Sequence, residues 1–386
     1  MAAQRRGAAG GIVAALVVGY LGMIVLGSYV FGGAVVDAMR TQQTADVVAN
    51  LPHQEVLMAS VAHERAYATV VDRACAPNRP DCEAANQART ALLDGVPELD
   101  KDGRPVVDDD GSVSFAHESA VQLTGAALDR RDQAIGALDV GMLDAQVRNT
   151  IELTLADRAA VDQVHSTVES SAGQAIKAYD MYLQDSARLN ESLAETTDGE
   201  LRAHLEAQLL LAELALAVLQ ERPLVSLSLG AFEFGQPGYL EPAVAQVTAV
   251  DEQVATAQDA LGRAGSAQQV PAIDGELTKV RSAVLSGELA AVTPAQAQGF
   301  ASASAAWFGE LRTAQDALRL ETIELAQDQA NAATNRVLLT GAVTAGVLVL
   351  GLAAVITVSV LLLRRRPTPT PPPAGWKQPV VPAVQR

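Results

Sequence analysis

The sequence predicts an all-α membrane protein in which two transmembrane helices flank an elongated helical-bundle domain outside the membrane. Residues 7–36 and 337–363 contain no charged side chain. Each run exceeds the roughly 20 apolar residues that a helix needs to cross a hydrocarbon layer of about 30 Å. Between the two runs, apolar residues recur at helical rather than alternating spacing, which indicates helices without a sheet.

The first transmembrane helix is expected at residues 10–36, after a short N-terminal segment, 1–9. Backbone amides inside hydrocarbon must pair within their own segment, so the run is helical despite its many Val and Gly residues. Arg5 and Arg6 would also fit the start of a cleaved signal peptide. However, the apolar stretch is far longer than the usual 7 to 15 residues, and no Ala-x-Ala cleavage pattern follows it. We therefore expect a retained anchor.

The second transmembrane helix is expected at residues 337–363, followed by a proline-rich tail, 364–386. Three consecutive arginines, Arg364 to Arg366, begin that tail. Since basic residues favour the cytoplasmic side, both chain ends are predicted to be cytoplasmic and residues 37–336 extracytoplasmic. The tail is too short and too rich in proline to bury a core, so no folded output module is expected there.

The predicted outer domain is strongly acidic. All 45 acidic residues lie in 37–336 together with 21 of the 28 basic residues, which gives this segment a net charge of −24. Nucleic acid binding is excluded as a function class because it needs a basic surface. An anionic ligand would have to be held by a local pocket against the overall field.

Helical segments of the outer domain can be placed from apolar spacing and from breakers. The first helix should run on from the membrane to about Arg73. Pro223 should bend or end another helix at Arg222, because proline lacks an amide donor and clashes with the preceding turn. Thr293-Pro294 is a good helix start, and no strong breaker separates it from the second apolar run. The remaining helices are expected at 83–93, 115–138, 144–193, 201–222, 244–263 and 273–285.

Two cysteines, Cys75 and Cys82, bracket a turn-rich segment of the outer domain. A loop-closing disulfide in an oxidising compartment fits this spacing, and two free thiols are the alternative. A zinc site is disfavoured because no second Cys or His pair stands at ligand spacing. The sequence also carries no phosphate-binding glycine loop, no His-Glu-x-x-His and no Gly-x-Ser-x-Gly, so we expect neither an enzyme nor a cofactor.

Arg65 and Arg222 stand where their helices should be apolar. Because a buried cation is costly unless it is paired, something anionic should meet each of them. The candidates are a carboxylate on another helix or a small planar oxyanion, which suits the guanidinium fork; snorkelling to the surface is the third possibility. The apolar residues on the same stripes are Met58, Val61 and Ala68 for the first arginine and Ala215, Val218, Leu219 and Val225 for the second.

The two Glu-Arg motifs, Val61 to Tyr67 (VAHERAY) and Val218 to Leu224 (VLQERPL), give the chain a resemblance to the nitrate- and nitrite-sensing (NIT) domain family of bacterial membrane sensor proteins. The resemblance covers roughly residues 51–325. It implies two stacked four-helix bundles that bind nitrate or nitrite, with Arg65 and Arg222 among the anion contacts. The kinase modules of some family members have no counterpart here, so a signal would need a separate cytoplasmic signalling protein.

Two functions follow as hypotheses. The first is a receptor-like protein, expected to be a homodimer in two-component signalling, whose outer bundle binds a small oxyanion and alters the cytoplasmic ends. The second is a non-catalytic envelope scaffold or protein-interaction module without a small-molecule ligand. The scaffold predicts that Arg65 and Arg222 are both engaged in internal salt bridges.

Overall fold

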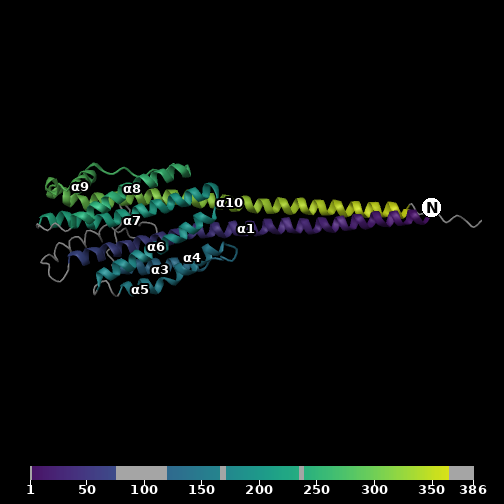
Figure 1. Cartoon of the computed structure of the whole chain (residues 1–386), viewed down its shortest axis with the longest axis horizontal. Helices are drawn as coiled ribbons and strands as arrows, with labels where there is room; N and C mark the ends of the chain where they lie inside the picture. Colours follow the sequence, from purple (N-terminus) through teal and green to yellow (C-terminus); the bar gives the residue numbers. More distant parts are fainter. Residues whose placement is uncertain (1, 75–119, 166–170, 234–238, 365–386) are drawn as a thin grey trace, which may run out of the picture. The chain divides into compact units, whose positions relative to one another are not determined.

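The computed structural model describes residues 2–74, 120–165, 171–233 and 239–364. Within these ranges every regular element is an α-helix, apart from one short 3-10 helix, which confirms the predicted all-α class. Cys75, Cys82, the helix expected at 83–93 and the part of the proline-rich tail after Arg364 lie outside the described residues. The helices, drawn in Figure 1, are α1 (Ala2–Ala74), α3 (Ala120–Gly136), α4 (Ala145–Ala156), α5 (Arg158–His165), α6 (Ala172–Thr196), α7 (Gly199–Glu233), α8 (Leu240–Ala264), α9 (Gly275–Ser286), the 3-10 helix η2 (Leu289–Ala291) and α10 (Pro294–Arg364).

The chain divides into two compact units, and the first consists of the N-terminal part of α1 and the C-terminal part of α10. Both parts are long and apolar enough to cross a membrane. Their large apolar side chains are exposed, for example Val25 (70%) and Leu350 (72%). Contiguous exposed apolar surface of this kind marks a membrane or partner interface. The structure is thus compatible with a two-pass membrane protein, while the orientation stays a prediction.

Glycines let the two apolar segments pack closely against each other. A methyl group at Gly341 would lie 2.9 Å from the Phe31 ring, and one at Gly27 would lie 2.7 Å from the Thr344 methyl group. Small residues at such points are the usual means of helix association in hydrocarbon, where no hydrophobic force favours pairing. The segments of α1 and α10 therefore form an intramolecular pair.

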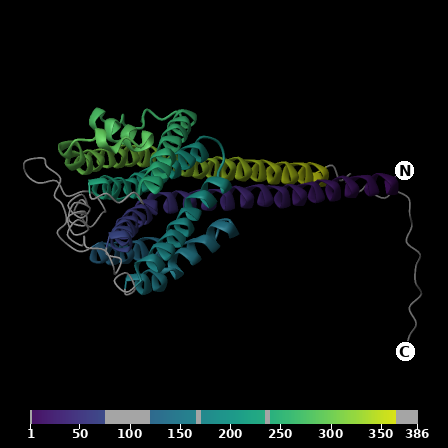
Figure 2. The ribbon, with the colours of Figure 1, turned by 60° about the vertical axis from the view of Figure 1, so that its left-hand side comes forward.

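The second unit, Met39–Ala332, is close in extent to the predicted outer domain. Figures 1 and 2 show α8 lying along α7 and α9 beside α8, while α4 and α5 lie along α6. Two buried apolar clusters hold this unit together. The smaller one includes Leu51, Leu193 and Leu205, and the larger one runs between α1, α6, α7, α8 and α10. The stacking of two four-helix bundles stays a prediction.

The single helix expected over 144–193 is wrong, because three helices, α4, α5 and α6, occupy this stretch. A straight helix of that length would extend for about 75 Å at 1.5 Å per residue. The break lets α4 fold back along α6 and bury Val147 and Ile151 beside Leu189 and Leu193. Burial of apolar surface thus overrides helical propensity, which differs little from residue to residue.

Of the two outcomes expected at Arg222, a bend or a helix end, the helix end is wrong, since α7 continues through Pro223 to Glu233. An internal proline costs a helix about 3 kcal/mol. Apolar side chains on both sides of it, Leu219 and Val225, are completely buried in the larger cluster. Burying two such residues contributes a comparable amount, about 1.5–3 kcal/mol each, which keeps the helix intact.

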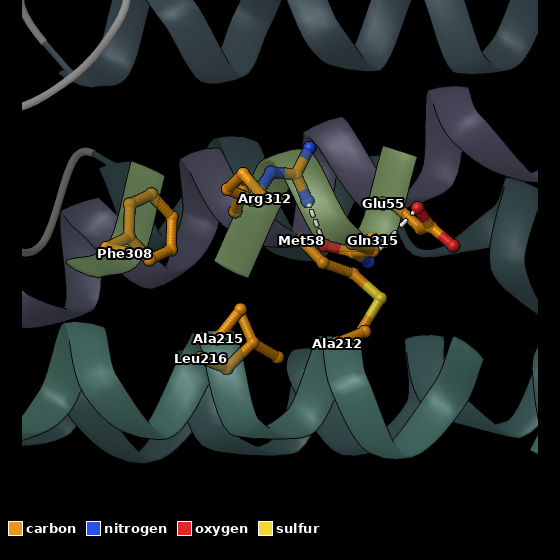
Figure 3. Close-up of a pocket in the computed structure, with 9 residues that line it drawn as sticks. Glu55, Met58, Ala212, Ala215, Leu216, Phe308, Arg312 and Gln315 are labelled. Atoms are coloured by element: carbon orange, nitrogen blue, oxygen red, sulfur yellow. Dashed lines mark hydrogen bonds between the residues drawn. The ribbon is translucent and has the colours of Figure 1, made fainter. Parts of the chain in front are cut away.

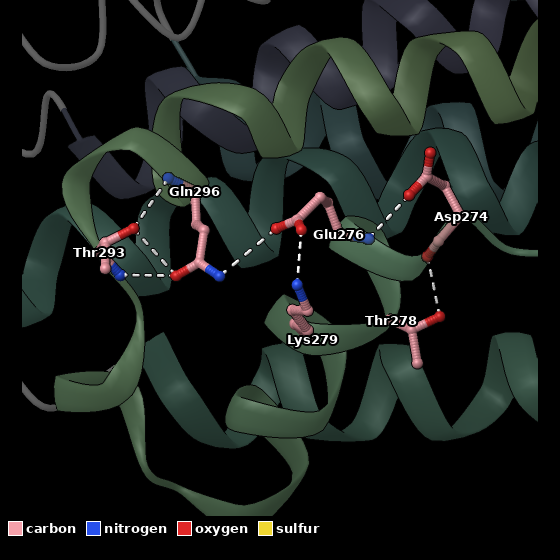
Figure 4. Close-up of polar contacts among 6 residues, drawn as sticks. All are labelled: Asp274, Glu276, Thr278, Lys279, Thr293 and Gln296. Atoms are coloured by element: carbon pink, nitrogen blue, oxygen red, sulfur yellow. Dashed lines mark hydrogen bonds and ion pairs between the residues drawn. The ribbon is translucent and has the colours of Figure 1, made fainter.

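The start of α10 is confirmed at the predicted position. Thr293 Oγ1 accepts a hydrogen bond from the Gln296 amide (3.3 Å), and Gln296 Oε1 accepts one from the Thr293 amide (2.9 Å), which makes a reciprocal capping box (Figure 4). The Gln296 side chain also donates to Glu276 of α9 (3.4 Å). Asp274 caps α9 by accepting from the Glu276 amide (2.7 Å). These caps connect the starts of α9 and α10.

Candidate functional site

Arg65 of α1 lies against α6, where it pairs with Asp180. Its Nε donates to Asp180 Oδ1 and its Nη2 donates to Asp180 Oδ2 (3.3 Å). The arginine side chain is 17% exposed and the carboxylate 48% exposed. Of the partners considered for this arginine, a carboxylate from another helix is the one observed.

Glu64, the other member of the first motif, also faces α6. The Tyr179 hydroxyl donates to Glu64 Oε2 at 2.6 Å. Burial, followed by the nearby carboxylate, raises the pKa of Tyr179 well above its ordinary value. The motif thus gives α1 two neighbouring polar contacts with one helix.

Arg222 of α7 is 5% exposed, as its apolar stripe predicts. Its positive charge reaches His63 of α1, whose pKa it helps to lower. His63 and Arg65 stand two residues apart, about 200° round the helix, so they point to opposite sides of α1. Arg222 therefore acts on the side of α1 opposite to the Arg65 pair with Asp180.

Glu221 is used by a third arginine. Arg281 of α9 donates from Nε and Nη2 to the two Glu221 oxygens, at 2.9 and 3.0 Å, and both side chains are buried. The guanidinium carbon lies 5.7 Å from the Trp307 ring centre, and the Arg281 Nη1 atom forms an ion pair with Asp251 Oδ1 at 2.8 Å. Burial raises the pKa of Glu221 even though Arg281 opposes the shift. This network joins α7, α8, α9 and α10.

His63 is the point on α1 where two cations act together. Burial is the largest cause of a pKa lowered to about 3, and the charges of Arg222 and Arg312 lower it further. The imidazole is thus neutral at ordinary pH. Its ring meets the edge of Phe308 at 5.9 Å between centres and 84° between planes. Helices α1, α7 and α10 therefore each contribute one polar group here.

A small hollow adjoins this point between the same three helices. Its cavity volume is about 10 Å³, which is the space of about one water molecule. The walls on α1 and α7 are apolar, except for Glu55. Arg312 and Gln315 of α10 supply the other polar atoms, and Figure 3 shows the hydrogen bonds from Arg312 through Gln315 to Glu55. The lining residues are Glu55, Met58, Ala59, Ala212, Ala215, Leu216, Phe308, Arg312 and Gln315.

Glu55 is a buried carboxyl group shared by three helices. Gln208 of α7 donates to its Oε1, and Gln315 of α10 donates to its Oε2 at 3.1 Å. Arg319 Nη1 lies 3.9 Å from Oε2. Burial raises the pKa of Glu55, and the charges of Arg319 and Arg312 only partly offset that effect.

Sequence reasoning predicted the burial of Arg222 and did not single out Glu55 or Arg312. Glu55 stands four residues after Leu51 and three before Met58, both buried, so it occupies the same apolar stripe as these two. Such a stripe position is the signal that could have identified it. Arg312 gives a weaker signal, because it lies beside a polar face of α10 and is only partly buried.

No metal centre is indicated, since the parts of the chain that the structure describes contain no group of three or more His, Cys, Asp or Glu side chains that could hold an ion. The site is instead a buried set of guanidinium, imidazole, carboxamide and carboxyl groups. Such a set can bind a small polar molecule through hydrogen bonds and charge. No protein-family model matches the chain, and neither a curated protein nor a solved structure does.

Proposed function

We propose that this chain is a receptor-like membrane protein whose outer helical domain binds a small planar oxyanion, with nitrate and nitrite as the leading ligands. Residues Arg5, Arg6 and Arg364 to Arg366 support cytoplasmic ends on both sides of that domain, by the preference of basic residues for the cytoplasm. The resemblance of the two Glu-Arg motifs to NIT domains supports the choice of ligand.

The convergence of Arg222 and Arg312 on His63 carries the proposal. Two guanidinium groups from helices about 90 residues apart in sequence act on one neutral buried imidazole. Guanidinium presents parallel donors to two oxygens of a planar oxyanion, and a buried location strengthens each charged hydrogen bond. In a domain of net charge −24, such a cationic point is where an anion would be held.

Signal transfer would use α1 and α10. Each contributes to the proposed site, and each contains one of the apolar candidate spans. A ligand shifts a conformational equilibrium only by its differential affinity for the two states. We propose that an anion between Arg222 and Arg312 favours one arrangement of α10 against α1, and that a separate cytoplasmic protein, within a homodimeric assembly, reads the change.

The test is calorimetric titration of the full-length chain in detergent micelles with nitrate, and then with nitrite, chloride and sulfate. Native protein should bind nitrate, and Arg222→Gln and Arg312→Gln should each weaken binding at least tenfold. Arg263→Gln is the matched control, because Arg263 is 54% exposed, pairs with Asp259 and does not line the hollow. The control should bind within about twofold of native, given that exposed ion pairs contribute little.

Arg65→Ala separates this site from the one expected from sequence. Because Arg65 already has a carboxylate partner in Asp180, the variant should keep nitrate affinity within about twofold. Absence of nitrate binding by the native protein, or equal affinity in all the variants, would refute the receptor proposal.

A second candidate function, a scaffold without a small-molecule ligand, is favoured by two observations. Arg65 is engaged by an internal carboxylate, and the hollow holds only about one water molecule without movement of its walls. The scaffold predicts that no oxyanion gives a binding heat. The same titration therefore decides between the two functions.

A further inference from the structure

Glu55 and the proposed anion would depend on the same cation. Arg312 lines the hollow together with Glu55 and hydrogen-bonds to Gln315 (2.7 Å), which in turn donates to the Glu55 carboxyl (3.1 Å). The Arg312 charge also acts on His63, at the proposed anion site. One guanidinium therefore connects the anion site with the buried carboxyl group.

Few groups balance the charge of Glu55. In the described part of the chain, the charged groups that act on it all come from α10, namely Arg319, Arg312 and Asp316, and the last of these is unfavourable for a carboxylate. From α7 it receives only the uncharged Gln208. Arg319 is also committed to Asp316, at 3.0 Å. The carboxylate thus relies on Arg312 for part of its stabilisation, in a site that is otherwise desolvated.

An anion that binds Arg312 would remove the part of the Glu55 stabilisation that this arginine provides. Two negative charges in a poorly solvated site also repel each other strongly, because the interior screens charge far less than water does. When a neighbouring carboxyl group can be neutralised by a proton, this repulsion is relieved, as in pairs of carboxylates that share one site. Gln208 and Gln315 can rotate their amides to hydrogen-bond with a protonated carboxyl.

We propose that oxyanion binding at Arg312 is coupled to uptake of a proton by Glu55, so that the protein responds to its anion and to acidity together. This inference rests on the proposed oxyanion-binding function. It makes anion affinity increase as pH falls, by up to tenfold per pH unit over the range in which the proton is taken up on binding. Reciprocally, the bound anion favours the protonated state of Glu55.

Nitrate is the appropriate probe, since it does not itself take up protons in the working range. The full-length chain in detergent is titrated with nitrate at several pH values between about pH 5 and about pH 8. Each titration is carried out in two buffers that differ in ionisation enthalpy. The difference in binding heat between the buffers gives the number of protons taken up per nitrate. For native protein, we expect a positive number up to one and an affinity that rises with acidity.

Glu55→Gln keeps a hydrogen-bonding side chain of nearly the same shape and removes the titration. This variant should bind nitrate with no proton uptake and with an affinity that no longer depends on pH. Glu252→Gln on α8, where the side chain is exposed, is the matched control and should behave as native. Should Glu55→Gln fail to fold, Glu55→Asp, which keeps a carboxyl group, should retain uptake with a shifted pH midpoint.

The two proposals fail in different ways. Nitrate binding by native protein without proton uptake at any pH, or uptake that persists in Glu55→Gln, overturns the coupling and leaves the receptor function standing. An absence of nitrate binding removes the receptor function and the coupling together.

Discussion

Acid should destabilise this protein through His63 in particular. Its pKa falls from 6.5 to about 3 in the fold, first because the imidazole is buried and then because Arg222 and Arg312 lie near it. Unfolding therefore takes up a proton at this residue. The stabilisation is complete above pH 6.5 and is lost as pH falls toward about 3.

The size of the effect follows from the shift. One pKa unit corresponds to about 1.4 kcal/mol, so the complete shift of His63 amounts to about 5 kcal/mol. Between pH 7 and pH 4.5 about 2 to 3 kcal/mol of it should be lost. This is a large fraction of the total stability of a typical domain, which is about 5–15 kcal/mol.

Comparison of native protein with His63→Gln isolates this contribution. Glu55 has a raised pKa, so its contribution to the unfolding free energy increases as pH falls. Both native protein and His63→Gln contain Glu55, so this contribution cancels when their unfolding free energies are subtracted. Unfolding by urea in detergent can be followed by the fluorescence of Trp307, whose side chain is 3% exposed. The native advantage over His63→Gln should shrink by about 2 to 3 kcal/mol between pH 7 and pH 4.5. Parallel pH profiles for the two proteins would refute the reasoning.

Two further predictions concern the stability of the bundle. Arg281→Met should cost about 3–5 kcal/mol because it leaves the buried Glu221 carboxylate without its partner, and Glu221→Leu added to Arg281→Met should recover most of the loss in the same urea assay. Thr293→Ala should cost about 1 kcal/mol, because it removes the side-chain cap of α10; Thr293→Ser, which keeps the hydroxyl, should unfold at the native urea concentration.

Local signals predicted much of the fold. The first helix was expected to run on to about Arg73 and is helical throughout Ala2–Ala74, and α10 begins at Pro294 as expected. In each case the deciding information is local: an uncharged apolar run, a capping threonine, or a proline at the first helical position. Such features act within one turn of helix, so no knowledge of the tertiary structure is needed to interpret them.

The two errors in the predicted helix boundaries arise from tertiary packing, not from local signals. The break before α6 and the passage of α7 through Pro223 both depend on what the chain packs against. Propensity terms of about 1–3 kcal/mol are outweighed when several apolar residues on both sides enter a core. Which residues enter the core is a property of the assembled bundle, which periodicity along one helix does not specify.

Periodicity likewise predicted which face Arg65 and Arg222 occupy, but not which helix each face meets. Arg222 is buried as expected, whereas Arg65 reaches Asp180 of α6, on the other side of α1 from His63. The pairing joins residues 115 apart in sequence. Spacing within α1 carries no information about that partner. A charged residue within an apolar stripe, such as Glu55, remains the most useful sequence signal of a buried polar site.

The contacts of α1 suggest which helix would move on ligand binding. On one side Glu64 and Arg65 bind α6, and on the other Glu55 binds α7 and α10. A displacement of α1 would break both sets, and each buried polar group left without its hydrogen bond costs about 1–3 kcal/mol. A ligand of millimolar affinity has only about 4 kcal/mol available. A displacement of α10 would disturb the contacts of Glu55 with Gln315 and Arg319 but would leave those of α1 with α6 and of Glu55 with Gln208 in place, so it breaks fewer contacts than a displacement of α1. We therefore expect α10 to carry the change toward the second apolar span.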